Sequence, residues 1–178
     1  MTDILTLTMN PAVDLSVTAP AIQPTHKIRS GDERREPGGG GINVARVLRR
    51  LGADPRALFP AGGALGDLLV ELVEREGISA VPVRVAQVTR ENFTATDLST
   101  GEQFRFVLPG PTLSEHEWRA CLVELAAHRT ANYVVASGSL PPGVPTVFQA
   151  EIARVAADAG ARFVVDSSGE SLRAALEV

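Results

Sequence analysis

The pattern of apolar and polar positions alternates between strand-like and helix-like segments along most of the chain. Residues 4–8 predict a short buried strand, and apolar residues from Ile42 to Leu51 recur at helical spacing until Gly52 ends the helix. The pattern continues with a strand and loop at 56–63, helices at 65–77, 114–129, 146–160 and 169–176, and strands at 132–137 and 162–166. Strands that alternate with helices through tight loops indicate an α/β fold with a largely parallel, doubly wound sheet.

Two segments do not follow this alternation. Residues 12–37 are polar and turn-rich after an apolar start, and the 81–87, 91–98 and 102–108 stretches read as short alternating strands. We therefore expect residues 1–178 to be the N-terminal portion of a single domain, with residues of about 12–37 and 85–108 inserted in it as a small separate sheet.

Composition and charge narrow the function classes. The 178 residues are 44% hydrophobic, carry a net charge of −4 and contain no basic block, which favours neither nucleic acid nor an anionic membrane as partner. The N-terminus has no cationic signal-peptide region, and no apolar run approaches the ~18 residues of a membrane span. The single cysteine, Cys121, fits a reducing cytoplasm and a buried thiol in the core.

Four consecutive glycines, Gly38 to Gly41, stand directly before the first predicted helix. They do not match a dinucleotide fingerprint, because the sixth position is Asn43 or Val44 rather than glycine. A Walker loop is excluded as well, since no Gly-Lys pair occurs in the chain. Two interpretations stay open: tight packing of the helix on the sheet, and close approach of a ligand, which the length of the run favours.

Other chemistry has little support. His26, His116 and His128 lack metal-ligand spacing, and no G-x-S-x-G elbow indicates a serine hydrolase. Asp67 is interpreted as a partner of a helix dipole in the first turn of its helix.

Seven stretches occur in one order along the chain and together resemble the N-terminal part of ribokinase-like sugar kinases. They read TLTMNPAVD, EPGGGGINVAR, FPAGG, TRENF, GEQFRFVLPGP, SGSLPPGV and VVDSSGESL. The resemblance is closest to the type-2 6-phosphofructokinase branch of the phosphofructokinase B family. It implies ATP-dependent phosphorylation of fructose 6-phosphate to fructose 1,6-bisphosphate in glycolysis. The all-glycine block favours this substrate, because the 1-phosphofructokinase branch typically carries a lysine there; tagatose-6-phosphate kinase is a further alternative.

The resemblance also implies roles for individual residues. Gly38, Gly39, Gly40, Asn43 and Asp14 match the positions that contact the sugar in this family. Lys27 and Arg90 match contacts to its phosphate, and Arg29 is a weaker candidate that would reach a partner subunit. Ser139 is a further substrate-binding candidate, because it lies at the carboxyl end of a buried strand, where open α/β sheets bind their ligands. Asp166 is expected either near the metal and phosphates or as a helix N-cap.

The family's remaining machinery is expected outside this chain. The resemblance implies Mg-ATP as cofactor, a Gly-Ala-Gly-Asp motif whose aspartate is the base, and an Asn-x-x-Glu motif for magnesium, and neither string occurs here. We therefore expect a truncated chain that lacks its nucleotide half and is inactive alone, or else a non-catalytic module that binds sugar phosphates. The small sheet would be a lid over the sugar that pairs with a second lid in a homodimer.

Overall fold

A parallel five-stranded sheet forms the centre of the molecule in the computed structural model, which describes residues 3–177. Its strand order is β5-β4-β1-β8-β9, and every neighbouring pair is parallel. The strands are β1 (Ile4–Leu7), β4 (Arg56–Ala61), β5 (Ser79–Arg84), β8 (Tyr133–Ser137) and β9 (Arg162–Asp166). The carboxyl ends of β1 and β8 therefore meet at one edge of the sheet, where open α/β sheets bind their ligands.

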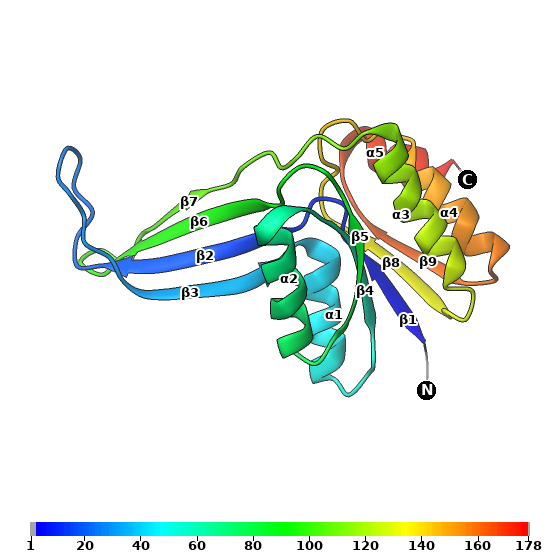
Figure 1. Ribbon diagram of the computed structural model, residues 1–178, viewed down its shortest axis with the longest axis horizontal. Coiled ribbons are helices and arrows are strands. Elements are labelled where there is room, and N and C mark those ends of the chain that lie inside the picture. Colours follow the sequence, from blue (N-terminus) through cyan, green and yellow to red (C-terminus); the bar gives the residue numbers. More distant parts are fainter. Residues whose placement is uncertain (1–2, 178) are drawn as a thin grey trace.

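Helices cover both faces of this sheet (Figure 1). The five helices are α1 (Gly40–Arg50), α2 (Gly63–Arg75), α3 (Glu115–Ala127), α4 (Phe148–Asp158) and α5 (Gly169–Leu176). One core packs α1 and α2 against the sheet around Phe59 and Leu69, and the other packs α3 and α4 around Leu5, Trp118 and Phe148. The predicted doubly wound α/β fold is confirmed.

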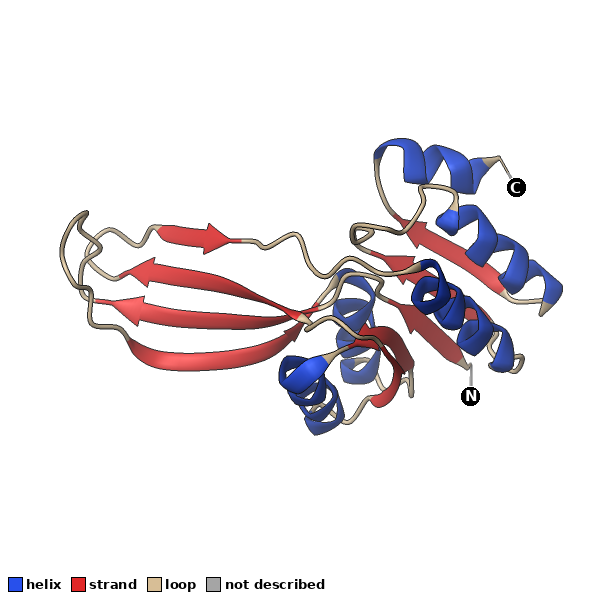
Figure 2. Cartoon of the chain, turned by 45° about the horizontal axis from the view of Figure 1, so that its top comes forward, coloured by secondary structure: helices blue, strands red, loops and turns tan. Residues whose placement is uncertain are grey.

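A second, four-stranded sheet projects from the body as an extended arm (Figures 1 and 2). Its order is β3-β2-β6-β7, made of β2 (Ala12–Ala19), β3 (Gly31–Gly38), β6 (Arg90–Asp97) and β7 (Gln103–Phe106). The central pair β2 and β6 is parallel, whereas the outer pairs are antiparallel. We call this sheet the lid sheet.

The two faces of the lid sheet differ in chemistry. Leu15, Phe93 and Phe106 lie in one cross-strand row, and the rings of Phe93 and Phe106 have centroids 6.1 Å apart. Because side chains alternate along a strand, Asp14 and Asn92 lie on the opposite face. The lid sheet thus has one apolar face and one polar face.

Two local predictions need comment. The expected strand at 81–87 is β5, two residues earlier, and it extends the main sheet because it pairs in parallel with β4. The interpretation of Asp67 was wrong: α2 begins at Gly63, so its first turn contains no acidic residue, and Asp67 instead pairs with Arg84.

Ser114 and Glu117 form a reciprocal capping box at the start of α3. The predicted burial of Cys121 is confirmed. Cys121 is fully buried, and burial raises the pKa of its thiol to about 12, so it is a core side chain rather than a nucleophile.

Candidate functional site

The glycine run packs against the chain itself. A Cβ on Gly38 would lie 2.3 Å from Oδ2 of Asp14, and one on Gly40 would lie 2.2 Å from Oγ of Ser137. The other two glycines meet Thr8 and the Leu7 carbonyl oxygen at similarly short distances. Tight packing, one of the two interpretations left open, therefore accounts for all four residues without a ligand. The run brings the start of α1 close to β1, β2 and β8.

Asp14 is held on the polar face of the lid sheet. Its Oδ1 accepts a 2.8 Å hydrogen bond from the Asn92 side chain, and the Oδ1 of Asn92 accepts one from the backbone N–H of Leu108. Asp14 is half-buried beside Gly38, so the carboxylate sits where the lid sheet joins α1. Such a fixed carboxylate can accept charge-assisted hydrogen bonds from hydroxyl groups of a ligand.

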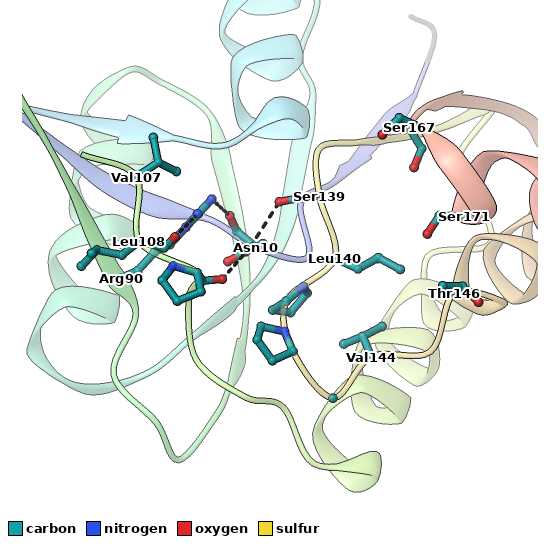
Figure 3. Close-up of a pocket in the computed structure, with 15 residues that line it drawn as sticks. Asn10, Arg90, Val107, Leu108, Ser139, Leu140, Val144, Thr146, Ser167 and Ser171 are labelled. Atoms are coloured by element: carbon teal, nitrogen blue, oxygen red, sulfur yellow. Dashed lines mark hydrogen bonds between the residues drawn. The ribbon is translucent and has the colours of Figure 1, made fainter. Parts of the chain in front are cut away.

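A cavity of about 670 Å³ opens between the base of the lid sheet and the carboxyl ends of the main strands (Figure 3). Five segments form it: the link from β1 to β2, the start of β6, the link from β7 to α3, the loop after β8, and the segment that leads into α5. The residues that supply its polar side chains are Asn10, Arg90, Ser139, Thr146, Ser167, Ser168 and Ser171. A cavity of this size, with one cation and several hydroxyls, suits a small anionic polar ligand.

Arg90 is the cation that lines this cavity. Its guanidinium donates to the backbone carbonyl oxygens of Asn10, at 2.7 Å, and of Leu108 and Pro11. Burial lowers the pKa of Arg90, and the nearby Asp14 carboxylate opposes that shift. Backbone carbonyls orient the guanidinium without neutralising its charge, so it can still attract an anion.

Ser139 lines the same cavity as Arg90, and Asn10 lies between the two residues (Figure 3). It follows β8 in the loop that continues through Pro141 and Pro142, and its Oγ lies 3.3 Å from Nδ2 of Asn10. The structure thus brings Arg90 and Ser139, two of the sequence-predicted residues, into one cavity.

Asn43 and Asp166 lie on the other side of the Ser137–Ser139 loop. They line a second, smaller hollow together with Gly40 and Ser137, and Oδ2 of Asp166 accepts a 2.8 Å hydrogen bond from Ser137. The N-cap of α5 is Ser168, so the alternative role for Asp166 as an N-cap is wrong. Asp166 is the last residue of β9 and lies two residues before the N-cap of α5.

Lys27 and Arg29 lie far from the cavity of their own chain. Both are exposed in the loop between β2 and β3, which forms the tip of the lid sheet (Figure 1). Within residues 3–177, neither forms an ion pair. The structure therefore does not bring these two cations to Arg90 and Ser139.

The described part of the chain offers no ready metal site. Among residues 3–177, no three His, Cys, Asp or Glu side chains are grouped as they would be to hold an ion. Asp166 contributes a single carboxylate, so these residues do not by themselves fit magnesium. None of the helices that are described is long and apolar enough to span a membrane.

Two asparagines were missed in the sequence. Neither Asn10, which lines the cavity, nor Asn92, which orients Asp14, was identified as a candidate. A signal was present for Asn10: a polar side chain directly after a buried strand lies at the ligand-binding edge of an α/β sheet. Asn92 gives no comparable signal, because its partner is set by the register between β2 and β6.

The fold and the site together define a ribokinase-like α/β protein with a β lid. Residues 7–178 match the family model described as pfkB family carbohydrate kinase. This chain belongs to the pfkB family of carbohydrate kinases.

Relatives within that family narrow the comparison. The ATP-dependent 6-phosphofructokinase isozyme 2 of Mycobacterium tuberculosis is 46% identical over 171 residues, which cover 96% of this chain and 50% of the relative. The tagatose-6-phosphate kinase of Staphylococcus epidermidis is 35% identical over 97% of the chain and 56% of the relative. The structure of Escherichia coli phosphofructokinase-2 in complex with fructose-6-phosphate matches with a TM-score of 0.93 and 42% identity, over 99% of this chain and 58% of that one. The chain thus spans about half the length of the curated relatives it matches.

Proposed function

We propose that this chain is the sugar-binding and lid portion of an ATP-dependent 6-phosphofructokinase, with fructose 6-phosphate as its substrate. The observation that carries the proposal is the placement of Arg90 and Ser139 in one cavity beside Asp14, at the carboxyl ends of the central strands. A guanidinium and a hydroxyl suit a phosphate group, whereas a fixed carboxylate suits sugar hydroxyls. The higher identity to 6-phosphofructokinases than to tagatose-6-phosphate kinases supports the choice of substrate.

The phosphate end of the site would use Arg90 for charge and Ser139 for a hydrogen bond. The sugar end would use Asp14 and the backbone of Gly38, Gly39 and Gly40. Asn43 lies on the far side of the Ser137–Ser139 loop, so it would contact a sugar that extends over the glycine run. Asp166 lies in the same hollow and would face the transferred phosphoryl group rather than the sugar.

The base and the Mg-ATP site belong to the same proposal. Phosphoryl transfer from ATP needs a proton acceptor at the sugar hydroxyl and magnesium at the nucleotide phosphates. The two motifs expected to supply them are not found in the sequence, so the 178 residues alone would bind sugar phosphate without transferring phosphate. A cytoplasmic location fits this function.

A homodimer through the lid sheets completes the proposal. The apolar face of the lid sheet leaves Phe93 at 37% and Phe106 at 59% exposure, which is unusual for phenylalanines in a sheet. Packing two lid sheets together would bury both. It would also place Lys27 and Arg29, at the lid tip, near the partner's cavity rather than their own.

The experiment is a kinase assay paired with a binding measurement. The purified chain is mixed with Mg-ATP and, separately, fructose 6-phosphate, fructose 1-phosphate and tagatose 6-phosphate, and ADP release is followed. Each sugar phosphate is then titrated calorimetrically into the chain. We expect no ADP release and tightest binding of fructose 6-phosphate.

Other outcomes have distinct meanings. Turnover would show that the base lies within these residues and would contradict that part of the proposal. Binding of tagatose 6-phosphate or fructose 1-phosphate in preference would favour the corresponding kinase. Absence of binding by all three would contradict a sugar-phosphate site.

A further inference from the structure

Asn10 forms hydrogen bonds with three of the segments that line the cavity. It lies between β1 and β2 and is 5% exposed. Its side-chain Nδ2 donates to the Pro109 carbonyl oxygen at 3.0 Å and to Oγ of Ser139 at 3.3 Å, and its backbone oxygen accepts from Arg90 at 2.7 Å (Figure 3). Asn10 thus connects the link from β7 to α3, the loop after β8, and Arg90 at the start of β6.

The orientation of the Asn10 amide is fixed by Pro109. A carbonyl oxygen can only accept a hydrogen bond, so the NH₂ group must face Pro109 and the Oδ1 atom must face away. Among residues 3–177 no group donates to that buried Oδ1 atom, which packs against Gly110, where a Cβ would lie 2.2 Å from it. A buried acceptor without a partner persists only where other contacts determine the arrangement.

The fixed amide determines what Ser139 can do. The two N–H bonds of Nδ2 point to Pro109 and Ser139, so the Ser139 oxygen is an acceptor in this contact. A serine hydroxyl has one hydrogen, and that hydrogen then remains free to point into the cavity. A phosphate group offers only acceptor oxygens when it is doubly ionised, which is the complement of a free O–H donor.

We propose that Asn10 is a positioning residue for phosphate binding: by donating to Ser139, it directs the Ser139 hydroxyl hydrogen toward the ligand's phosphate. This inference rests on the proposed function, since it assumes that the cavity binds a sugar phosphate. Asn10 does not itself touch the phosphate. Its backbone bond to Arg90 places the second phosphate-binding group in the same arrangement.

The test compares two substitutions that differ in shape and in donor capacity. Asn10→Asp keeps the shape of the side chain but accepts from Ser139, which turns the hydroxyl hydrogen away from the cavity. Asn10→Ala removes shape and donor, and leaves the Ser139 hydroxyl free to rotate. We expect Asp to be the more damaging, raising the dissociation constant for fructose 6-phosphate at least about tenfold, as for a lost hydrogen bond to a charged group.

A double-mutant cycle with alanine substitutions tests the role of Ser139 without adding a charge. Ser139→Ala alone should weaken binding of fructose 6-phosphate by about tenfold. In that background, Asn10→Ala should weaken it by no more than about twofold, because the hydroxyl that Asn10 positions is already gone. Asn132→Asp is the matched control, since Asn132 lies at the opposite end of β8 and uses only its Oδ1 as acceptor. It should bind as the unmodified chain does.

The outcomes distinguish this inference from the proposed function. Circular dichroism and thermal unfolding first establish whether each variant is folded. If Asn10→Asp does not fold, the double-mutant cycle with the two alanine substitutions is the deciding test. Losses from Asn10→Ala and Ser139→Ala that multiply in the double variant would overturn the positioning role while leaving the sugar-phosphate site intact. Better binding by Asn10→Asp than by Asn10→Ala would overturn it too. No binding by the unmodified chain would contradict the proposed function itself.

Discussion

At the scale of single residues, the candidate site depends on a few polar side chains held by backbone groups. Arg90 donates to three backbone carbonyl oxygens, and Asp14 is fixed through Asn92. In both arrangements the charge of the side chain stays available to a ligand. Pre-oriented charges of this kind lower the entropy that must be lost when a ligand binds.

Substitution of either charged residue is therefore expected to weaken ligand binding. Arg90→Ala and Asp14→Ala should each cost about 1.5–3 kcal/mol in fructose 6-phosphate binding, as for hydrogen bonds to charged groups. Calorimetric titration measures the effect, and Arg50→Ala, at an exposed position on α1, is the control. Unchanged affinity in both site variants would contradict the assignment of the cavity.

At the scale of elements, the glycine run is the clearest determinant of how α1 meets the sheet. The sequence showed that these residues are unusual, but not that the close neighbours are Asp14, Thr8 and Ser137. Those neighbours come from three different strand ends, so their proximity follows from the strand order. Helical spacing, alternation and turn residues are local, which is why the element types could be predicted while the contacts of single side chains could not.

Gly40→Ala tests this close packing. The new methyl would lie 2.2 Å from Oγ of Ser137 and 2.7 Å from its carbonyl carbon, so the start of α1 must shift. We expect a loss of about 1–3 kcal/mol in the free energy of unfolding, the range for overpacking, measured by urea denaturation. Gly31→Ala is the matched control because a Cβ there meets open space. Equal stability of the two variants would contradict the packing role.

The Asp97 carboxylate connects two segments at the tip of the lid sheet by hydrogen bonds. It is buried, and it accepts hydrogen bonds from Ser99 and from the backbone N–H of Ile22, which begins the loop that carries Lys27. The Ser99 hydroxyl, followed by the Ile22 N–H, lowers the pKa of Asp97. Because the folded pKa lies below the unfolded one, the stabilisation is present at neutral pH and is lost as the pH falls below about 4.

The pH dependence of this contact can be measured with Asp97→Asn. The variant should unfold at lower temperature than the unmodified chain at pH 6, and the difference should shrink as the pH is lowered toward 3. Thermal unfolding across this range gives the comparison. A difference that does not change with pH would show that the carboxylate charge does not stabilise the tip.

At the scale of the whole molecule, residues 3–177 leave two apolar surfaces uncovered. The apolar face of the lid sheet exposes Phe93 and Phe106, and β9 is one of the two edge strands of the main sheet, with Val164 at 46% exposure. The alternation in the sequence predicted a separate lid sheet. The role of the cations at its tip could not follow from one chain, since Lys27 and Arg29 lie far from their own cavity.

The proposed dimer predicts the effect of a charge on the lid's apolar face. Phe106→Glu should convert a dimer into a monomer, because a carboxylate buried between two lid sheets would be desolvated. Sedimentation velocity or light scattering measures the mass. Val123→Glu, an equally apolar exposed position on α3, should leave the dimer intact. If Phe106→Glu and Val123→Glu had the same mass, the chain would not associate through the apolar face of the lid sheet.

The most direct test of the account is a calorimetric comparison of fructose 6-phosphate with fructose. The central claim is that the cavity lined by Arg90 and Ser139 binds the phosphate of a sugar phosphate. It predicts saturable binding of fructose 6-phosphate at one site per chain, with much weaker binding of fructose and of fructose 6-phosphate to Arg90→Ala. Equal affinity for the two sugars, or no binding of either, would contradict it.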